Sequence, residues 1–294
     1  MTQICIPNDY PIELTPPDIS GYRQGNRGID FVHRLDGAAP GPHIGVTAIV
    51  HGNEPCGAFR AHCYFELHVE QGPVLEQEGL VIGAVTGVQG ISWTEVCING
   101  QSAHAGTTPM RLRRDPGYCA GAIATFVRDL TRRLGGGQVG TVGRIDVYPN
   151  LVNVVPSRVV LTVDLRNTDE APLQDAERRL REFLAELAEE EHVEITTRQL
   201  ARFEPVEFDP GMVDRVEATA QRLGYSTRRM PSGAGHDAQM LARVCPTAMV
   251  FTPSVAGLSH NIAEFTERGD IEDGANVLLQ VLVERLGVTS AVAD

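Results

Sequence analysis

The sequence predicts an α/β domain that is interrupted by a smaller, ferredoxin-like α+β domain. The chain has 294 residues, enough for about two domains of ordinary size. Apolar runs of strand length lie in the first third and the last quarter of the chain, next to turns and helical patterns, as in α/β folds. Between them, strands and two amphipathic helices follow in the order β-α-β-β-α-β, which is that of a split ferredoxin-like unit.

The α/β domain is predicted to comprise residues 1–88 and 209–294. Its apolar residues recur at strand or helix spacing, and the first forty residues are too rich in breakers to specify regular structure. Strands are expected at 43–50, 64–70, 80–88 and 247–251, and helices at 212–223, just after His236, and at 271–286.

The inserted domain is predicted over residues 89–208. Its first helix has Ile123, Val127 and Leu130 on one face and is stopped by Gly135 and the two glycines after it. Strands are expected at 93–98, 139–148, 158–165 and 192–200, and helices at 115–134 and 173–188.

The composition excludes several classes of partner and enzyme. The chain has 25 basic and 38 acidic residues, for a net charge of -13, so a nucleic-acid partner is not expected. All the basic residues are Arg. Without Lys, Schiff-base chemistry, pyridoxal phosphate and the Lys-containing phosphate loop are excluded.

The cysteines and the hydropathy predict a cytoplasmic protein with no membrane partner. Six cysteines lie at irregular separations without a Cys-x-x-Cys pair, which is typical of reduced thiols. The N-terminus lacks the pattern of a secretion signal, and no apolar run approaches the ~18 residues of a membrane span.

Three histidines in the α/β segments are candidate metal ligands. His68 lies on a predicted strand with Glu66 and Glu70 on the same face. His260 lies in a small-residue loop, and His51 lies three residues before Glu54 in a turn, where both could bind one zinc. Spacing alone favours simpler interpretations of two of them: a solvated strand face for His68 and a surface turn for His260. For Glu54 the alternative is the start of a helix.

The inserted domain holds candidate substrate-binding groups. His104 is surrounded by small and hydroxyl residues that no core requires, so its segment is suited to close approach of a ligand or partner. Asn153 interrupts an apolar run and Arg166 ends a predicted strand. An amide and a guanidinium can hold a carboxylate. The alternatives are that Asn153 is a turn residue before Pro156 and that Arg166 forms a surface salt bridge.

These segments together resemble the N-carbamoyl-L-amino-acid hydrolase and allantoate amidohydrolase family, over about residues 64–287. The resemblance rests on the motifs at 66–76, 102–109, Asn153, 164–166, 232–238 and 259–261. It implies a zinc-peptidase-like α/β catalytic domain, here truncated, with an inserted lid and dimerisation domain. The implied activity is hydrolysis of a linear amide or ureido C–N bond.

The resemblance also implies roles for single residues. His68 and His260 would bind a divalent metal, with zinc expected and manganese or cobalt as alternatives. Asn153 and Arg166 would bind the substrate carboxylate, and His104 would stabilise the oxyanion in the partner subunit of a homodimer. Gln71 and His236 would lie near the substrate, a small ureido or N-acyl amino acid.

The N-terminal segment departs from that family, since it lacks the remaining metal ligands and the general base. Residues 1–60 instead resemble the succinylglutamate desuccinylase and aspartoacylase family, through Gly41-Pro42-His43 and the segment from His51 to Gly57. His51 and Glu54 are therefore expected to replace the missing ligands. Two alternatives stay open: a dimerising remnant without activity, and an aspartoacylase-type zinc deacylase.

Overall fold

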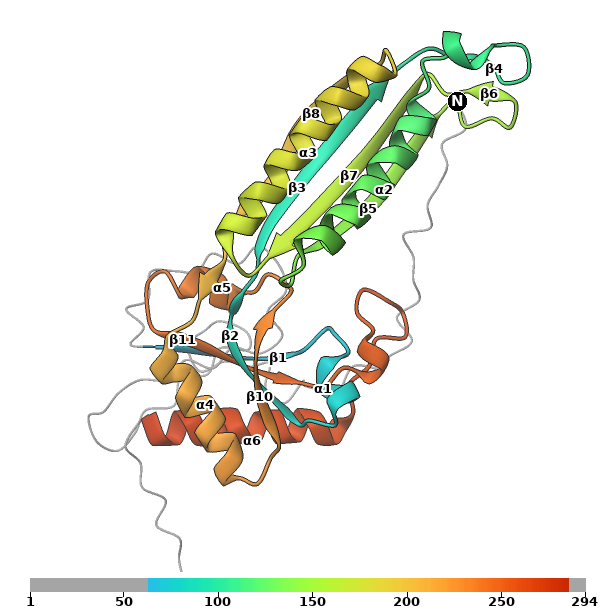
Figure 1. Cartoon of the computed structure of the whole chain (residues 1–294). Helices are drawn as coiled ribbons and strands as arrows, with labels where there is room; N and C mark the ends of the chain where they lie inside the picture. Colours follow the sequence, from blue (N-terminus) through green and yellow to red (C-terminus); the bar gives the residue numbers. More distant parts are fainter. Residues whose placement is uncertain (1–62, 286–294) are drawn as a thin grey trace, which may run out of the picture.

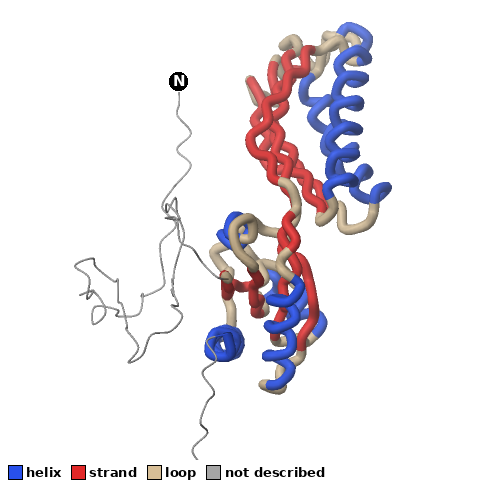
Figure 2. Tube along the Cα trace, turned by 90° about the vertical axis from the view of Figure 1, so that its left-hand side faces the viewer, coloured by secondary structure: helices blue, strands red, loops and turns tan. Residues whose placement is uncertain are grey.

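The computed structural model describes residues 63–285, which form two units (Figures 1 and 2). The mixed-sheet unit comprises residues 63–88 and 206–285, and the antiparallel unit comprises residues 90–203. The predicted strand at 43–50, His51 and Glu54 lie outside the described residues. Among the helices that are described, none is long and apolar enough to cross a membrane.

The mixed-sheet unit contains a five-stranded sheet in which β11 and β2 are central. β1 pairs in parallel with β11, β11 is antiparallel to β2, and β2 is parallel to β10 and antiparallel to the short β9. The strands are β1 (Tyr64–Val69), β2 (Ile82–Val88), β9 (Val206–Glu207), β10 (Thr227–Ser232) and β11 (Thr247–Thr252). All six residues of β11 are buried, so the core of this unit lies around that strand.

Helices α4 (Pro210–Arg222) and α6 (Arg268–Arg285) pack on the sheet. A Cβ on Gly274 of α6 would come within 2.7 Å of Leu67 Cδ1, so glycine allows this helix to approach β1. Because side chains alternate along a strand, Glu66 and His68 project from the face opposite Leu67. The short helix α5 (Asp237–Leu241) packs against β1 and β11, and α1 (Val74–Glu78) follows β1.

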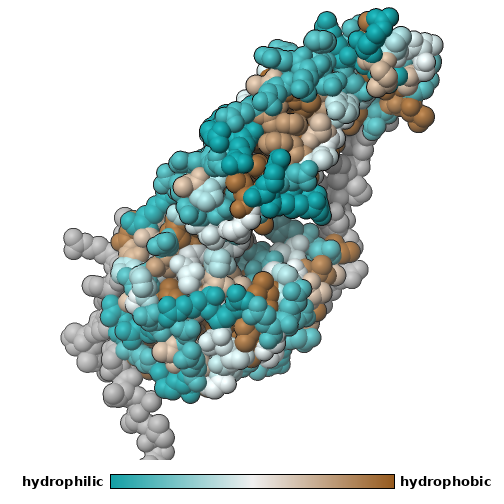
Figure 3. Space-filling view, in the orientation of Figure 1, coloured by the Kyte–Doolittle hydropathy of each residue, from teal (hydrophilic) through white to brown (hydrophobic). Residues whose placement is uncertain are grey.

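The antiparallel unit has the strand order β5-β7-β3-β8, which is the order of a ferredoxin-like fold. Its elements are β3 (Gly90–Asn99), α2 (Pro116–Leu134), β5 (Val139–Tyr148), β7 (Arg158–Asn167), α3 (Glu170–Glu190) and β8 (Glu194–Phe203). The two helices cover one face and enclose a core that includes Ile123, Leu161 and Leu180. Phe126 stacks on Phe183 with ring centroids 4.0 Å apart, and Figure 3 shows apolar surface between the helices.

A two-stranded ribbon lies at the end of the antiparallel unit that points away from the mixed sheet (Figure 1). It is formed by β4 (Ala103–His104) and β6 (Val154–Val155), next to the 3₁₀ turn η2 (Met110–Leu112). The ribbon was not predicted, because two residues per strand give no alternating pattern.

Two chain crossings join the units and lie against each other. The first is Gln89, between β2 and β3, and the second is Glu204 with Pro205, between β8 and β9. A Cβ on Gly90 would come within 2.7 Å of Pro205 Cδ and 2.8 Å of Leu173 Cδ2. Glycine is therefore required where the crossings meet.

Candidate functional site

His68 lies on β1 opposite Phe251 of β11. Its Nδ1 is 2.8 Å from the carbonyl oxygen of Val69, so the proton belongs on Nδ1 and Nε2 is the basic nitrogen. Metal-binding histidines commonly have one ring nitrogen held by a carbonyl or carboxylate in this way. The local geometry of His68 therefore suits a metal ligand.

His236 is buried against the same face of the sheet. Its side chain is 2% exposed, its ring centroid is 4.7 Å from that of His68, and its Nε2 is 2.7 Å from Ser232 Oγ. Burial, and then the nearby His68, lowers the pKa of His236 to about 3. The ring is therefore neutral at physiological pH, and the predicted role in substrate binding stays a prediction.

Glu66 connects β1 to the start of α5. One carboxylate oxygen accepts the backbone N–H of Ala238 at 2.9 Å, and the other lies 3.6 Å from His236 Nδ1. Burial raises the pKa of Glu66 above its usual value. Sequence reasoning placed Glu66 beside His68, but nothing in the sequence indicated its contact with His236.

Glu70 has a structural role that the strand pattern did not indicate. Its carboxylate accepts the backbone N–H groups of Val74 and Leu75, each at 2.8 Å, and it is 8% exposed. N–H groups in the first turn of a helix have no partner within the helix, and Glu70 supplies one for each of these two. Both carboxylate oxygens of Glu70 are therefore used at the start of α1.

Gln71 and the loop that carries His260 lie together beyond the end of β1. Gln71 Nε2 donates to Ser259 Oγ at 3.1 Å, and its backbone N–H donates to Ser254 Oγ. Glu264 closes the loop by accepting from Ser259 Oγ and from the backbone N–H of His260. The structure thus brings Gln71 next to the residue before His260, while Glu264 had no signal in the sequence.

Arg166 lies near the end of β7, at the junction of the units. Its Nε and Nη2 donate to both carboxylate oxygens of Asp164, at 2.7 to 3.1 Å. Its Nη1 donates to the carbonyl oxygen of Gly233, at 2.7 Å, in the loop that leads to His236. Arg166 is therefore attached to the same loop as His236, although it comes from the other unit.

His104 and Asn153 lie together on the ribbon, far from Arg166. His104 Nδ1 accepts from the backbone N–H groups of Gly106 and Thr107, at 3.0 and 3.2 Å, so its proton is on Nε2 and can be donated outward. The N–H of Ala105 donates to the carbonyl oxygen of Asn153.

β7 runs from Arg158, near the ribbon, to Arg166 and Asn167 at the junction. Eight strand residues span about 27 Å. Within one chain, Asn153 and Arg166 therefore do not form the predicted carboxylate site together.

The described residues do not by themselves form a metal site. No group of three or more His, Cys, Asp or Glu side chains between residues 63 and 285 is arranged to hold a metal ion. A catalytic zinc usually has three protein ligands. His68 and His260 are donors of the right kind, and the predicted ligands His51 and Glu54 lie outside these residues.

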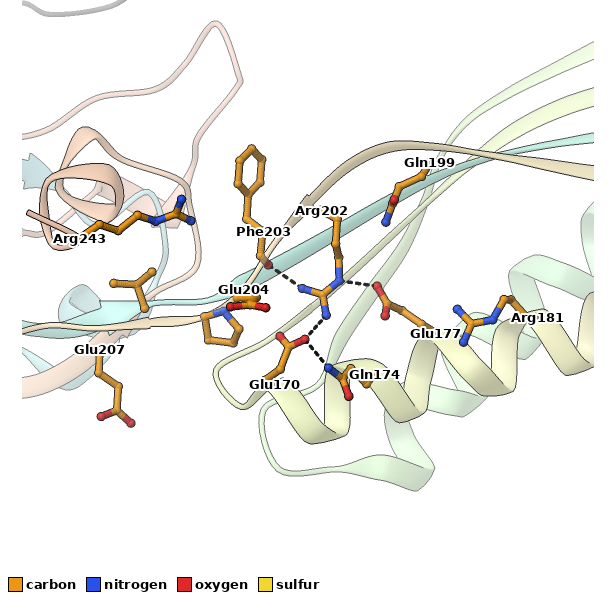
Figure 4. A pocket seen from close by; sticks show the side chains of 12 residues that line it. Glu170, Gln174, Glu177, Arg181, Gln199, Arg202, Phe203, Glu204, Glu207 and Arg243 are labelled. Carbon is orange, nitrogen blue, oxygen red and sulfur yellow. Dashed lines mark hydrogen bonds and ion pairs between the residues drawn. The ribbon is translucent and has the colours of Figure 1, made fainter. Parts of the chain in front are cut away.

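A hollow of about 1080 Å³ also lies at the junction, next to the second chain crossing (Figure 4). Arg202 occupies its wall and donates to Glu170, Glu177 and the carbonyl oxygen of Phe203. None of the predicted site residues within 63–285 lines this hollow. Its ion pairs tie the end of β8 to α3, so we assign it a structural role.

Known proteins resemble most of the chain. An N-carbamoyl-L-amino-acid amidohydrolase of Rhizobium meliloti is 42% identical over 233 residues, covering 79% of this chain and 56% of that protein. An allantoate amidohydrolase of Escherichia coli is 39% identical over 221 residues, covering 75% and 54%. A crystal structure titled as an amidase of the hydantoinase/carbamoylase family from Burkholderia multivorans has a TM-score of 0.75 at 45% identity, covering 80% and 57%.

These relatives confirm the resemblance stated from the motifs, and the chain spans about half the length of the curated relatives it matches. A sequence model described as peptidase family M20/M25/M40 matches residues 36–284. That match includes His51 and Glu54, which were compared above with a different zinc family. The chain belongs to peptidase family M20/M25/M40.

Proposed function

We propose that this chain is a metal-dependent amidohydrolase that cleaves a linear ureido or amide C–N bond of an N-carbamoyl amino acid or an allantoate-like substrate. The observation that carries the proposal is the contact of Arg166 with Gly233. This contact brings Arg166, the proposed carboxylate-binding group, beside the loop that leads to the buried His236 and, next to it, His68. The relatives named above favour this activity over an aspartoacylase-type deacylase or an inactive remnant.

The side chains divide the work between binding the substrate and stabilising charge. Arg166 would hold the carboxylate, and Gln71 would contact the substrate near the end of β1. His104 would donate its Nε2–H to the oxygen that becomes negative during attack on the ureido carbon. Such a donor in a site with little water lowers the barrier substantially.

His68 and His260 would hold a divalent metal, together with His51 and Glu54. Members of the M20 family are generally dependent on divalent metals, and we propose zinc, with manganese or cobalt as alternatives. When bound, the metal would polarise the ureido oxygen and lower the pKa of a bound water. The Nδ1 contact of His68 with Val69 supports this role, since it puts the ring proton on Nδ1 and leaves the lone pair on Nε2, the nitrogen that would bind a metal.

We also infer a homodimer formed through the antiparallel unit. His104 and Asn153 lie about 27 Å of strand from Arg166 in the same chain. In a two-fold dimer, the ribbon of each copy would reach the junction of the other, and symmetry would then complete both sites. Asn153 and His104 of the partner would in this way join Arg166.

Metal content and ammonia release test the activity. Protein purified without chelator is expected to contain about one or two metal ions per chain and to release ammonia from an N-carbamoyl-L-amino acid. Arg166→Ala should abolish turnover and keep the metal. A folded wild-type protein without metal and without turnover would overturn the proposal, and turnover only of N-acyl amino acids would support the deacylase.

Mixed dimers test the shared site. His104→Ala and Arg166→Ala should each be inactive alone. When the two are unfolded together and refolded, half of the dimers combine one copy of each variant and hold one intact site, so about a quarter of the wild-type activity should return. No recovery from refolded dimers would contradict a site built from two chains.

A further inference from the structure

Arg166 has five N–H groups, and Asp164 and Gly233 use only some of them. Asp164 accepts from Nε and Nη2, and the Gly233 carbonyl oxygen accepts from Nη1. One N–H on Nη1 and one on Nη2 are left by these contacts. Two N–H groups at the end of a guanidinium form the fork that matches a carboxylate.

The guanidinium of Arg166 also packs against an aromatic ring. Its central carbon lies 5.8 Å from the ring centroid of Trp93, in a cation–π contact. Trp93 pairs with Asp164 across β3 and β7, so both partners of Arg166 come from the same place in the sheet. The Arg166 side chain is only 23% exposed. Its rotamer is therefore restricted before any ligand arrives.

We propose that Asp164 is a positioning residue, which holds Arg166 so that its remaining N–H pair receives the carboxylate of the substrate. This inference rests on the proposed function, since it assumes that Arg166 binds that carboxylate. The alternative is that Asp164 merely neutralises Arg166. The two readings predict opposite effects when the charge of Asp164 is removed.

If Asp164 positions Arg166, its loss lets a long side chain sample other rotamers, and that freedom must be lost again on binding. Carboxylate affinity then falls. If Asp164 only competes for Arg166, its loss frees the guanidinium, and carboxylate affinity rises. The sign of the change therefore decides between them.

Trp93 provides the measurement, because it is the single tryptophan of the chain and lies against Arg166. The full-length protein is mixed rapidly with N-carbamoyl-L-alanine or with its carboxamide, and the fluorescence change is recorded before turnover. The Kd for each compound is compared between wild type, Asp164→Asn and Asp164→Glu. Asp146→Asn is the matched control, since Asp146 pairs with the exposed Arg144 on the same sheet.

We expect Asp164→Asn to weaken binding of the carboxylate up to about tenfold, which is the effect of ordering one long side chain on binding, and to leave binding of the carboxamide unchanged. Asp164→Glu should bind with intermediate affinity, and Asp146→Asn like wild type. In steady-state assays the change should raise KM more than it lowers kcat.

Unchanged or tighter carboxylate binding by Asp164→Asn would overturn the inference while leaving the proposed function in place. If wild type itself does not distinguish the carboxylate from the carboxamide, the proposed role of Arg166 fails, and this inference fails with it. Should Asp164→Asn not unfold cooperatively, the affinity of Asp164→Glu decides, because wild-type affinity there would contradict a positional role.

Discussion

The two units differ in how fully their strands are covered. In the antiparallel unit, β7 and β3 are central and α2 and α3 pack on their shared face. In the mixed-sheet unit, β11 is buried along its length, whereas all six residues of its neighbour β1 are only half-buried. Glu66 and His68 lie on this less covered strand. The comparison teaches that the candidate site draws on both kinds of strand, since His68 lies on β1 at the end of the described sheet and Arg166 lies on the central β7.

The largest expected effects come from the cores. Leu161→Ala and Phe251→Ala each remove a buried side chain, one from each unit, and should lower the free energy of unfolding by about 2–5 kcal/mol. The hydrophobic cores are separate clusters, so we expect each variant to affect mainly its own unit. Chemical denaturation followed by Trp93 fluorescence reports the antiparallel unit, and circular dichroism reports both.

Leu161→Ala should therefore shift the fluorescence transition, whereas Phe251→Ala should shift only part of the circular dichroism change. Equal shifts of both signals in both variants would break the comparison, because the units would then unfold as one cooperative body.

Removal of Glu70 should have the next largest effect. Glu70→Ala leaves two buried N–H groups at the start of α1 without acceptors, at a cost of about 1–3 kcal/mol. Thermal unfolding measures the loss, and Glu76→Ala is the control because Glu76 lies on the same helix but is exposed. Equal stability of the two variants would show that the capping contacts contribute little.

Helix caps should contribute similarly in the two units. Asp115 accepts from Gly117 and Tyr118 at the start of α2, and Asp209 accepts from Met212 at the start of α4. Replacing either by Ala should cost about 1 kcal/mol, measured by urea denaturation. A cost confined to Asp115→Ala would mean that α4 is held by packing instead of by its cap.

Thiol reactivity gives the smallest effect and a pH dependence. Burial raises the pKa of the Cys119 thiol from 9.0 to about 12, while Cys97 is half-buried and lies 3.3 Å from Arg158 Nε. Iodoacetamide at pH 8 should therefore modify Cys97 before Cys119, as mapped by mass spectrometry. Because the unfolded thiol ionises at lower pH than the folded one, Cys119 should destabilise the fold as pH rises from about 9 to 12. In Cys119→Ala that loss should shrink.

Much of the antiparallel unit could be predicted from sequence. Residues 139–148 were expected as a strand and are β5, and the predicted helix from 115 to 134 is α2, with Asp115 as its cap. These segments have strong periodicity and clear stop signals. β10 was missed because Arg228, Arg229 and Pro231 interrupt any apolar pattern. The two arginines instead pair with acidic residues on the surface.

The site was only partly predictable. Motifs mark His68, Gln71 and His260 as candidates, and the structure brings Gln71 to the His260 loop. The separation of Asn153 from Arg166 could have been predicted, since the strand expected at 158–165 lies between them and eight strand residues span about 27 Å. Contacts such as Glu66 with His236 depend on how α5 packs, which spacing along the chain does not encode.

The contact of Gly90 with Pro205 has a mechanical consequence. Because both chain crossings meet at this point, any change in the orientation of the antiparallel unit would pivot about it. The ribbon lies roughly ten strand residues, or about 33 Å, from this pivot. A rotation of about 10° would carry His104 through about 6 Å, and it would need matched changes in backbone angles at both crossings, Gly90 on one side and Glu204 with Pro205 on the other.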